Sequence, residues 1–321
     1  MLTFRSIASG SLALLASIGV AACGTDATGL AQASRQADFS QGNGEGAEAS
    51  AAAHRNLVAL RDELLAADRA YAALGAATNL VESLAAPMAD DGIFLAPGTG
   101  FLRGPDEVRT FLSANPINID SKWRWSVIRA DVSSDGQRGY TYGYSEFELP
   151  SGVVLPGKYQ AYWSRQSNGG WKMAAYKRSQ RAPGPVSLVP PPGFETPTTQ
   201  HRRYYPNTEP ATELPVLFGV DRAFSDAAQS GVADAFAAYV APDGAQSGGN
   251  LITWAFGPEA VRAAWAGVAP TFTWAPELGD VATSGDLGFT VGYVYSGGVA
   301  ISKYFTVWQK QPNGVWLYIV D

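Results

Sequence analysis

Two stretches of this chain, far apart in the sequence, follow one pattern. Residues 158–171 read KYQAYWSRQSNGGW, and residues 303–316 read KYFTVWQKQPNGVW. In each stretch an Asn-Gly pair separates two runs rich in aromatic and β-branched residues. Asn and Gly tolerate the positive φ of a tight hairpin turn, so each stretch predicts a β-hairpin.

Three further landmarks repeat in the same order before this hairpin. They are DRAY (68–71) with DRAF (221–224), GP (104–105) with GP (257–258), and GYTYGY (139–144) with GFTVGY (288–293). The first two pairs are separated by the same number of residues. Four matches in one order indicate an internal duplication, and hence two domains of one fold.

Composition predicts the boundaries of these domains. Residues 23–54 are rich in Gly, Ala, Ser and Gln, and cannot bury enough apolar surface to fold, so they predict a flexible tether. Residues 181–212 are rich in proline, which favours an extended linker. We therefore expect a first domain at 55–180 and a second at 213–321.

The N-terminus reads as a targeting segment, residues 1–22. Arg5 precedes a short apolar stretch, and residues 20–23 read VAAC, which resembles the bacterial lipobox. In that motif the cysteine thiol receives a diacylglyceryl group. Cys23 is the only cysteine, so the chain has no intramolecular disulfide to make. We expect a lipid anchor at Cys23 in the bacterial cell envelope; the alternative is an ordinary secretory signal with a chance cysteine.

Composition also argues against several functions. The net charge is −6 and no stretch gathers Lys and Arg, whereas a nucleic-acid partner requires a clustered basic surface. The only histidines, His54 and His201, stand in connecting segments. We therefore expect no metal site of the histidine type, no Ser-His-Asp triad and no cofactor.

Each copy places helices before strands. Leu57, Leu60, Leu64 and Tyr71 recur at helical spacing in the first copy. Asp-Gly pairs at 91–92 and 243–244 predict breaks after a second helix, and each Gly-Pro predicts the start of a third. Three or four strands follow. This order indicates an α+β fold with an antiparallel sheet.

The ordered motifs D-R-A-[FY], G-P, G-[YF]-T-x-G and K-Y-x-x-x-W-x-[RK]-Q-x-N-G-x-W resemble the nuclear transport factor 2-like (NTF2-like) superfamily. Within it they are most similar to the SnoaL-like branch of small bacterial domains, the DUF4440 type. The resemblance covers both domains. It implies two tandem cone-shaped domains, each a curved sheet wrapped around its first helix with a pocket inside. Such domains commonly pair through their convex faces, so we expect an intrachain pseudo-dimer and a monomeric chain.

Five residues are candidates for the pockets. Asp68 lies on the apolar stripe of the first helix, and Asp221 holds the same place in the second copy. Lys158 and Lys303 are the repeated cations that could pair with them inside the cones. Tyr142 differs from its counterpart in the second copy, which makes it the candidate pocket hydroxyl. The alternatives are solvated or structural charges, and core aromatics.

Three functions remain open. We favour a lipid-anchored protein that binds a small apolar or aromatic ligand, rather than an enzyme. The resemblance also allows an isomerase or dehydratase, with Asp68 as base and Tyr142 as oxyanion donor, although neither domain has the histidine that many relatives use. A protein-interaction scaffold at the envelope is the third possibility.

The lipobox predicts that Cys23→Ser abolishes membrane association through acyl chains. Mass spectrometry of the mature wild-type protein should show the acyl mass, and fractionation should leave the variant in the soluble fraction. A wild-type protein without acyl mass, or a variant that stays equally membrane-bound, would contradict the anchor.

Overall fold

The computed structural model describes residues 53, 56–197, 205, 208–248 and 251–321. These residues belong to one compact unit, Ala52–Asp321. Cys23 and the predicted signal segment lie outside the described residues. The domain boundaries stay a prediction, and we refer below to the first half, up to residue 180, and to the second half, from residue 210.

Both halves contain the same succession of elements, except that among the described residues α4 of the first half has no counterpart in the second. In the first half a helix at 56–77 precedes α2 (Leu80–Ala85), β1 (Met88–Leu95), β2 (Phe101–Arg103), α3 (Gly104–Ser113), α4 (Ile117–Asp120), β3 (Lys122–Val132), β4 (Arg138–Glu148), β5 (Val154–Arg165) and β6 (Trp171–Gln180). The second half contains α5 (Pro210–Ala228), α6 (Val232–Tyr239), β7 (Val240–Gln246), β8 (Ala255–Phe256), α7 (Gly257–Ala264), β9 (Thr273–Val281), β10 (Leu287–Ser296), β11 (Val299–Lys310) and β12 (Trp316–Val320).

Each half builds its own six-stranded sheet, and the two sheets have the same strand order. The strand orders are β2-β1-β6-β5-β4-β3 and β8-β7-β12-β11-β10-β9. Neighbours are antiparallel except β1 with β6 and β7 with β12, which are parallel. The predicted α+β fold and its duplication in tandem are thereby confirmed. We call the helix-covered side of each sheet the first cone and the second cone.

The repeated Gly-Pro motif starts a helix in both halves, as predicted. Pro105 occupies the first turn of α3, where a missing N–H costs nothing. Gly104 has a φ of 65°, and a Cβ there would lie 2.4 Å from the carbonyl oxygen of Asp90. Only glycine fits this corner between β2 and α3.

The prediction that the Asp-Gly pairs break the chain after a second helix is wrong. Asp91-Gly92 lies inside β1, where the pairing with β6 shifts register between Met88 and Ile93. A Cβ on Gly92 would lie 2.5 Å from the carbonyl oxygen of Met173 on β6. The glycine therefore allows β1 to pass close to β6 at a strand irregularity and does not form a turn. The sequence pattern did not predict the strand that contains it.

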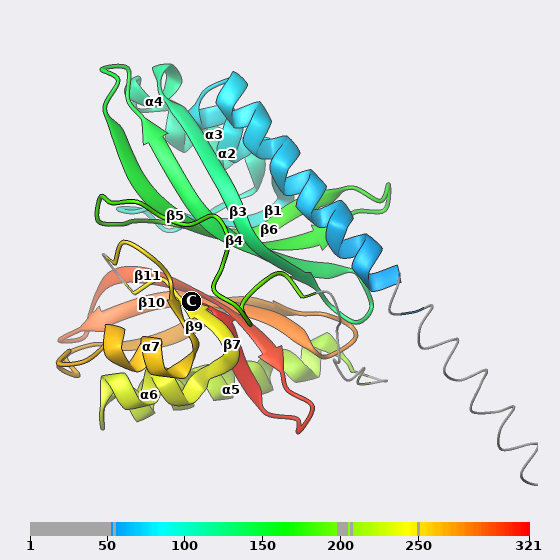
Figure 1. Ribbon diagram of the computed structural model, residues 1–321, viewed down its shortest axis with the longest axis vertical. Coiled ribbons are helices and arrows are strands. Elements are labelled where there is room, and N and C mark those ends of the chain that lie inside the picture. Colours follow the sequence, from blue (N-terminus) through cyan, green and yellow to red (C-terminus); the bar gives the residue numbers. More distant parts are fainter. Residues whose placement is uncertain (1–52, 54–55, 198–204, 206–207, 249–250) are drawn as a thin grey trace, which may run out of the picture. The chain divides into compact units, whose positions relative to one another are not determined.

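The two sheets pack against each other through their convex faces, with the helices of each half on the outer side (Figure 1). We call the buried residues between them the inter-sheet layer. From the first half it contains Ile93, Leu95, Ile128, Tyr140, Tyr142, Tyr144, Tyr162 and Ala175, and from the second Ala241, Ala245, Trp254, Ala282, Leu287, Phe289, Val291, Phe305, Val307, Ile319 and Val320. The predicted pseudo-dimer is thus formed within one chain.

Polar contacts at the edge of the layer follow the same pseudo-symmetry. The turn after β3 and the turn after β9 bind each other reciprocally. Asp135 accepts hydrogen bonds from Thr283 (2.6 Å) and the Ser284 N–H (3.0 Å), while Asp286 accepts from the Ser134 hydroxyl (2.6 Å). These hydrogen bonds hold the two sheets in a defined position relative to each other.

An isolated first half, residues 55–180, would expose the tyrosines of the inter-sheet layer to water. A contiguous apolar face of that kind favours association. We expect this fragment to dimerise or aggregate and the whole chain without residues 1–23 to be monomeric, measured by size-exclusion chromatography with light scattering. A well-behaved monomeric fragment would contradict the role given to the layer.

Candidate functional site

A buried carboxylate ties the first helix to the sheet in the first cone. The Asp68 side chain is fully buried and accepts hydrogen bonds from Trp125 Nε1 (2.8 Å), Thr141 Oγ1 (2.7 Å) and Tyr159 Oη (3.0 Å). Trp163 Nε1 in turn donates to Thr141 Oγ1 at 2.8 Å. The helix is thereby attached to three strands, β3, β4 and β5.

The second cone repeats this arrangement with the corresponding residues. Asp221, also fully buried, accepts from Trp274 Nε1 (2.8 Å) and Tyr304 Oη (2.6 Å). Trp308 Nε1 donates to Thr290 Oγ1 at 2.8 Å. Burial raises the pKa of both aspartates to about 6, because the charged form loses its hydration and the hydrogen bonds only partly compensate.

The predicted Asp–Lys pairs inside the cones are wrong. Lys158 Nζ donates to the carbonyl oxygens of Ser247 (2.5 Å) and Thr253 (2.7 Å) in the second half, and Lys303 Nζ donates to the carbonyl oxygen of Ala96 in the first. Successive side chains of a strand point to opposite faces. The neighbours Tyr159 and Tyr304 therefore face the aspartates, and the lysines face the other half.

Tyr142 is not a pocket hydroxyl either. It is fully buried in the inter-sheet layer, where its ring centroid lies 4.8 Å from that of Trp254. The same alternation explains its position, because Thr141 points to Asp68 and both neighbours of Thr141 point the other way. Of the five candidates, the structure places the two aspartates inside the cones, Lys158 and Tyr142 against the other half, and Lys303 at the border of a cavity.

The first cone is filled by side chains. The rings of Phe94 and Tyr176, which are paired on the neighbouring strands β1 and β6, stack side by side with their centroids 5.6 Å apart. The Arg178 guanidinium lies over the ring of Trp123 at 4.7 Å and over that of Phe147 at 5.7 Å. These aromatic rings occupy the space in which a ligand of this domain would lie.

The second cone is hollow. It contains a cavity of about 500 Å³, bordered by α5, α6, β7 and β9 to β11 of the second half and by residues 177–179 of the first half. Six aromatic side chains form much of the wall: Phe224, Phe236, Trp265, Phe272, Trp274 and Tyr304. Gln246, Thr306 and Asp321 supply a polar patch, and Lys177 and Lys303 border one side. Volume and lining are typical of a site for a small organic molecule.

Three substitutions between the copies explain the difference. In the first half Phe94 pairs with Leu102, which lies two residues before Gly104. In the second half Gln246 pairs with Ala255, which lies two residues before Gly257, so Gln246 occupies the position of Phe94. By the register of the last hairpin, Asp321 replaces Tyr176. A stacked aromatic pair thus becomes a small hydrogen-bonded pair, with Gln246 Nε2 donating to Asp321 Oδ2 at 3.2 Å.

The third substitution lies across the cavity from this pair. Ser296 stands in the second half where Phe147 stands in the first, as the shared GYTYGY and GFTVGY motifs show. Ser296 borders the cavity, whereas Phe147 packs on Trp123 with a centroid distance of 6.3 Å. The loss of this ring and of the stacked pair leaves the space in the second cone.

The aspartate networks are structural. Both oxygens of Asp221 accept hydrogen bonds, and Asp221 does not border the cavity. The same network is present in the first cone, where aromatic side chains pack together. Asp321 is the acidic residue that does border the cavity. Burial raises the pKa of its side chain, and the nearby Lys177 opposes this rise.

Comparisons with solved structures match single halves of the chain. A ketosteroid isomerase-like protein from Erwinia carotovora atroseptica is 23% identical, covering 37% of this chain and 97% of its own, with a TM-score of 0.28. An NTF2-like protein with a cystatin-like fold from Novosphingobium aromaticivorans is 15% identical (42% and 86%; TM-score 0.29). A domain of unknown function with a cystatin-like fold from Nostoc punctiforme is 16% identical (39% and 76%; TM-score 0.30).

No protein-family profile matches the chain. No curated protein matches it. The similarities to solved structures concern fold alone, and at these identities they say nothing of activity.

The raised pKa of Asp68 and Asp221 predicts a pH dependence of stability. In the unfolded chain these carboxyls lose their protons near pH 4, whereas in the native chain they keep them to about pH 6. The native state binds more protons in this window, so the free energy of unfolding falls as pH rises from about 4 to about 6. The fall is roughly 3 kcal/mol for each carboxyl.

Asp68→Asn and Asp221→Asn should each flatten this fall, because the amide has no proton to lose. Urea unfolding at several pH values measures it, and Asp106→Asn, at a side chain that is 95% exposed, is the matched control. Parallel pH curves for the wild type and both buried-site variants would contradict the proposed burial of the two carboxyls.

Proposed function

We propose that this protein binds one small, mainly apolar or aromatic molecule in the cavity of its second half. The observation that carries the proposal is the contrast between two copies of one domain. One copy fills its cone with Phe94, Tyr176 and Phe147, and the other opens a cavity of about 500 Å³ lined by aromatic rings. The first half acts as the structural partner that covers the convex face of the second.

Binding is favoured over catalysis because the cavity lacks a free general base beside an oxyanion donor. The Tyr304 hydroxyl is committed to Asp221 at 2.6 Å. The Asp321 carboxylate accepts hydrogen bonds from Thr306 Oγ1 (2.7 Å) and Gln246 Nε2 (3.2 Å). An isomerase-like site needs a base within reach of the substrate proton and a donor aimed at the developing charge.

We also propose that the protein is anchored to a membrane of the bacterial envelope by lipid at Cys23, as a monomer. The lipobox-like VAAC at 20–23 supports the anchor. In the part of the chain that the structure describes, no helix is both long enough and apolar enough to span a bilayer.

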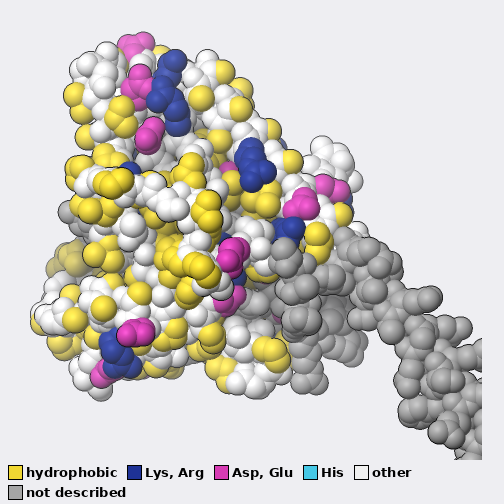
Figure 2. All heavy atoms as spheres, in the orientation of Figure 1, with side chains coloured by type: hydrophobic (Ala, Val, Ile, Leu, Met, Phe, Trp, Pro, Cys, Tyr) yellow, Lys and Arg dark blue, Asp and Glu magenta, His cyan; other side chains and the backbone are white. Residues whose placement is uncertain are grey.

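Nucleic acid is not a proposed partner. On the face shown in Figure 2, Lys and Arg side chains are scattered among acidic and apolar ones and form no continuous basic stripe. The net charge of −6 agrees with this distribution.

A cavity-filling substitution tests the proposal. Ser296→Phe copies the first half and should place a ring in the cavity. Binding of the neutral fluorescent probe N-phenylnaphthylamine should be saturable in the wild type. It should be weakened at least about fivefold in the variant, since overpacking a site costs roughly 1–3 kcal/mol.

Ser151→Phe is the matched control, because Ser151 is exposed in the loop between β4 and β5. It should bind the probe as the wild type does, and thermal unfolding should show that both variants are folded. A wild type that binds no probe, or a Ser296→Phe variant that binds it unchanged, would refute the proposed site.

A further inference from the structure

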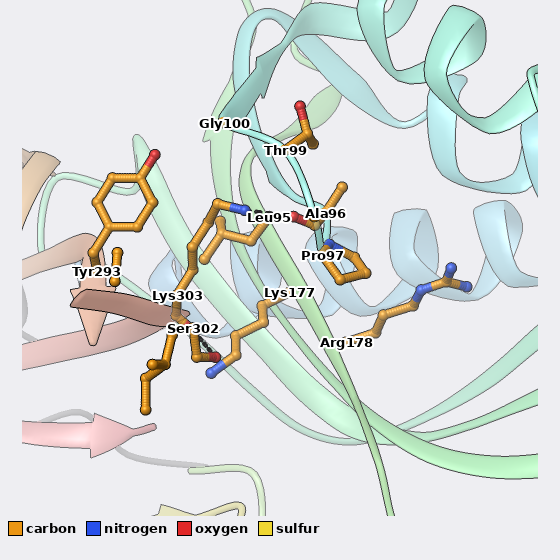
Figure 3. Close-up of a pocket in the computed structure, with 13 residues that line it drawn as sticks. Leu95, Ala96, Pro97, Thr99, Gly100, Lys177, Arg178, Tyr293, Ser302 and Lys303 are labelled. Atoms are coloured by element: carbon orange, nitrogen blue, oxygen red, sulfur yellow. Dashed lines mark hydrogen bonds between the residues drawn. The ribbon is translucent and has the colours of Figure 1, made fainter. Parts of the chain in front are cut away.

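A second hollow adjoins the cavity of the second cone. It has a volume of about 550 Å³ and is bordered by residues 95–100, by Lys177 of β6, and by Tyr293, Ser302 and Lys303 of the second half. We call it the lysine groove. In Figure 3 the Lys177 side chain reaches toward Ser302 and the Lys303 side chain reaches toward Ala96, while Arg178 points away from both.

The lysine groove and the cavity meet along the same residues. The residues that border both hollows are Lys177, Arg178, Ile301, Ser302 and Lys303. A molecule whose aromatic body fills the cavity can therefore extend a substituent into the groove. The chemistry of that substituent follows from the side chains that meet it there.

The groove is basic and has no acidic residue in its lining. The Lys303 ammonium donates only to a neutral acceptor, the carbonyl oxygen of Ala96. Among the described residues, neither Lys177 nor Lys303 has a carboxylate within ion-pair distance. Burial lowers the pKa of both lysines, and the Asp321 carboxylate partly opposes this for Lys177.

The corresponding place in the first half is closed. Lys158, the counterpart of Lys303, is fully buried and donates to two carbonyl oxygens, and its ammonium lies 5.6 Å from the ring centroid of Trp254. The hollow beside it measures about 10 Å³. Among the described residues, a lysine of this repeated pair therefore borders a large cavity in the second half, at Lys303, and not in the first, at Lys158.

We propose that the ligand of the second cone is an amphipathic anion, with an aromatic or apolar body in the cavity and a carboxylate, sulfonate or phosphate in the lysine groove. The inference rests on the proposed function and names the class of ligand. The partly buried Lys303 ammonium, which donates to a neutral carbonyl oxygen, gains most from an anionic acceptor, because charge-assisted hydrogen bonds are the stronger ones. Asp321 stays with its own donors, Thr306 and Gln246, on the wall of the cavity.

Two probes with the same aromatic skeleton test this inference on the whole chain without residues 1–23. Anilinonaphthalene sulfonate carries an acidic group, and N-phenylnaphthylamine does not. The wild type should bind the sulfonate about tenfold more tightly than the neutral amine, the effect of one charge-assisted hydrogen bond. Lys177→Met and Lys303→Met should each reduce this preference, measured as the ratio of the two affinities within each variant.

Lys122→Met is the control, because Lys122 is exposed on β3 and far from the groove lining. It should keep the full preference. Thermal unfolding establishes that each variant is folded, and conservative Lys177→Arg and Lys303→Arg should retain the preference for the sulfonate.

The outcomes separate the two proposals. If the neutral probe binds as well as the sulfonate, or if both methionine variants keep the preference, the anionic ligand is refuted and the cavity proposal stands. If neither probe binds the wild type, or if Ser296→Phe binds both unchanged, the proposed function fails and the inference fails with it.

Discussion

The inter-sheet layer is the constraint on which the rest of this structure depends. Burial of two convex, aromatic faces against each other removes a large apolar surface from water. Because strand side chains alternate between faces, the layer also decides which residues can enter the cones. On β4 and β5, Tyr142 and Lys158 are committed to the other half, and Thr141 and Tyr159 to the buried aspartate.

Duplication allowed the two copies to diverge while the layer and the aspartate networks kept them alike. The first copy retains bulky rings at Phe94 and Tyr176, which fill its cone. In the second, Gln246 and Asp321 hydrogen-bond to each other and occupy less space. Aromatic rings in a core supply much buried apolar area, so the filled copy gains packing that the hollow copy forgoes. One copy stabilises the unit, and the other carries the cavity.

Sequence alone predicted the duplication, the α+β fold, the helices that start at Gly-Pro and the pairing of the halves. These follow from local patterns, which recur at fixed places in both copies. It did not predict the partners of Asp68 and Lys158. Lys158 and Tyr159 are adjacent on β5 and point to opposite faces, and the sequence did not tell which of the two faces Asp68. The signal was present: Tyr140, Tyr142 and Tyr144 alternate along one face of β4, and this face is the one that packs on the other sheet. The cavity depends on summed side-chain volumes. Only the aligned exchange of Phe94 and Tyr176 for Gln246 and Asp321 could have pointed to it.

The central claim is that one of the two cones, and not both, holds a ligand. Native mass spectrometry of the protein purified from its source tests it most directly, because a carried molecule adds its mass to each chain. We expect a single small molecule per chain of the wild type, and none in Ser296→Phe. Two molecules per chain, or one that persists in this variant, would contradict it.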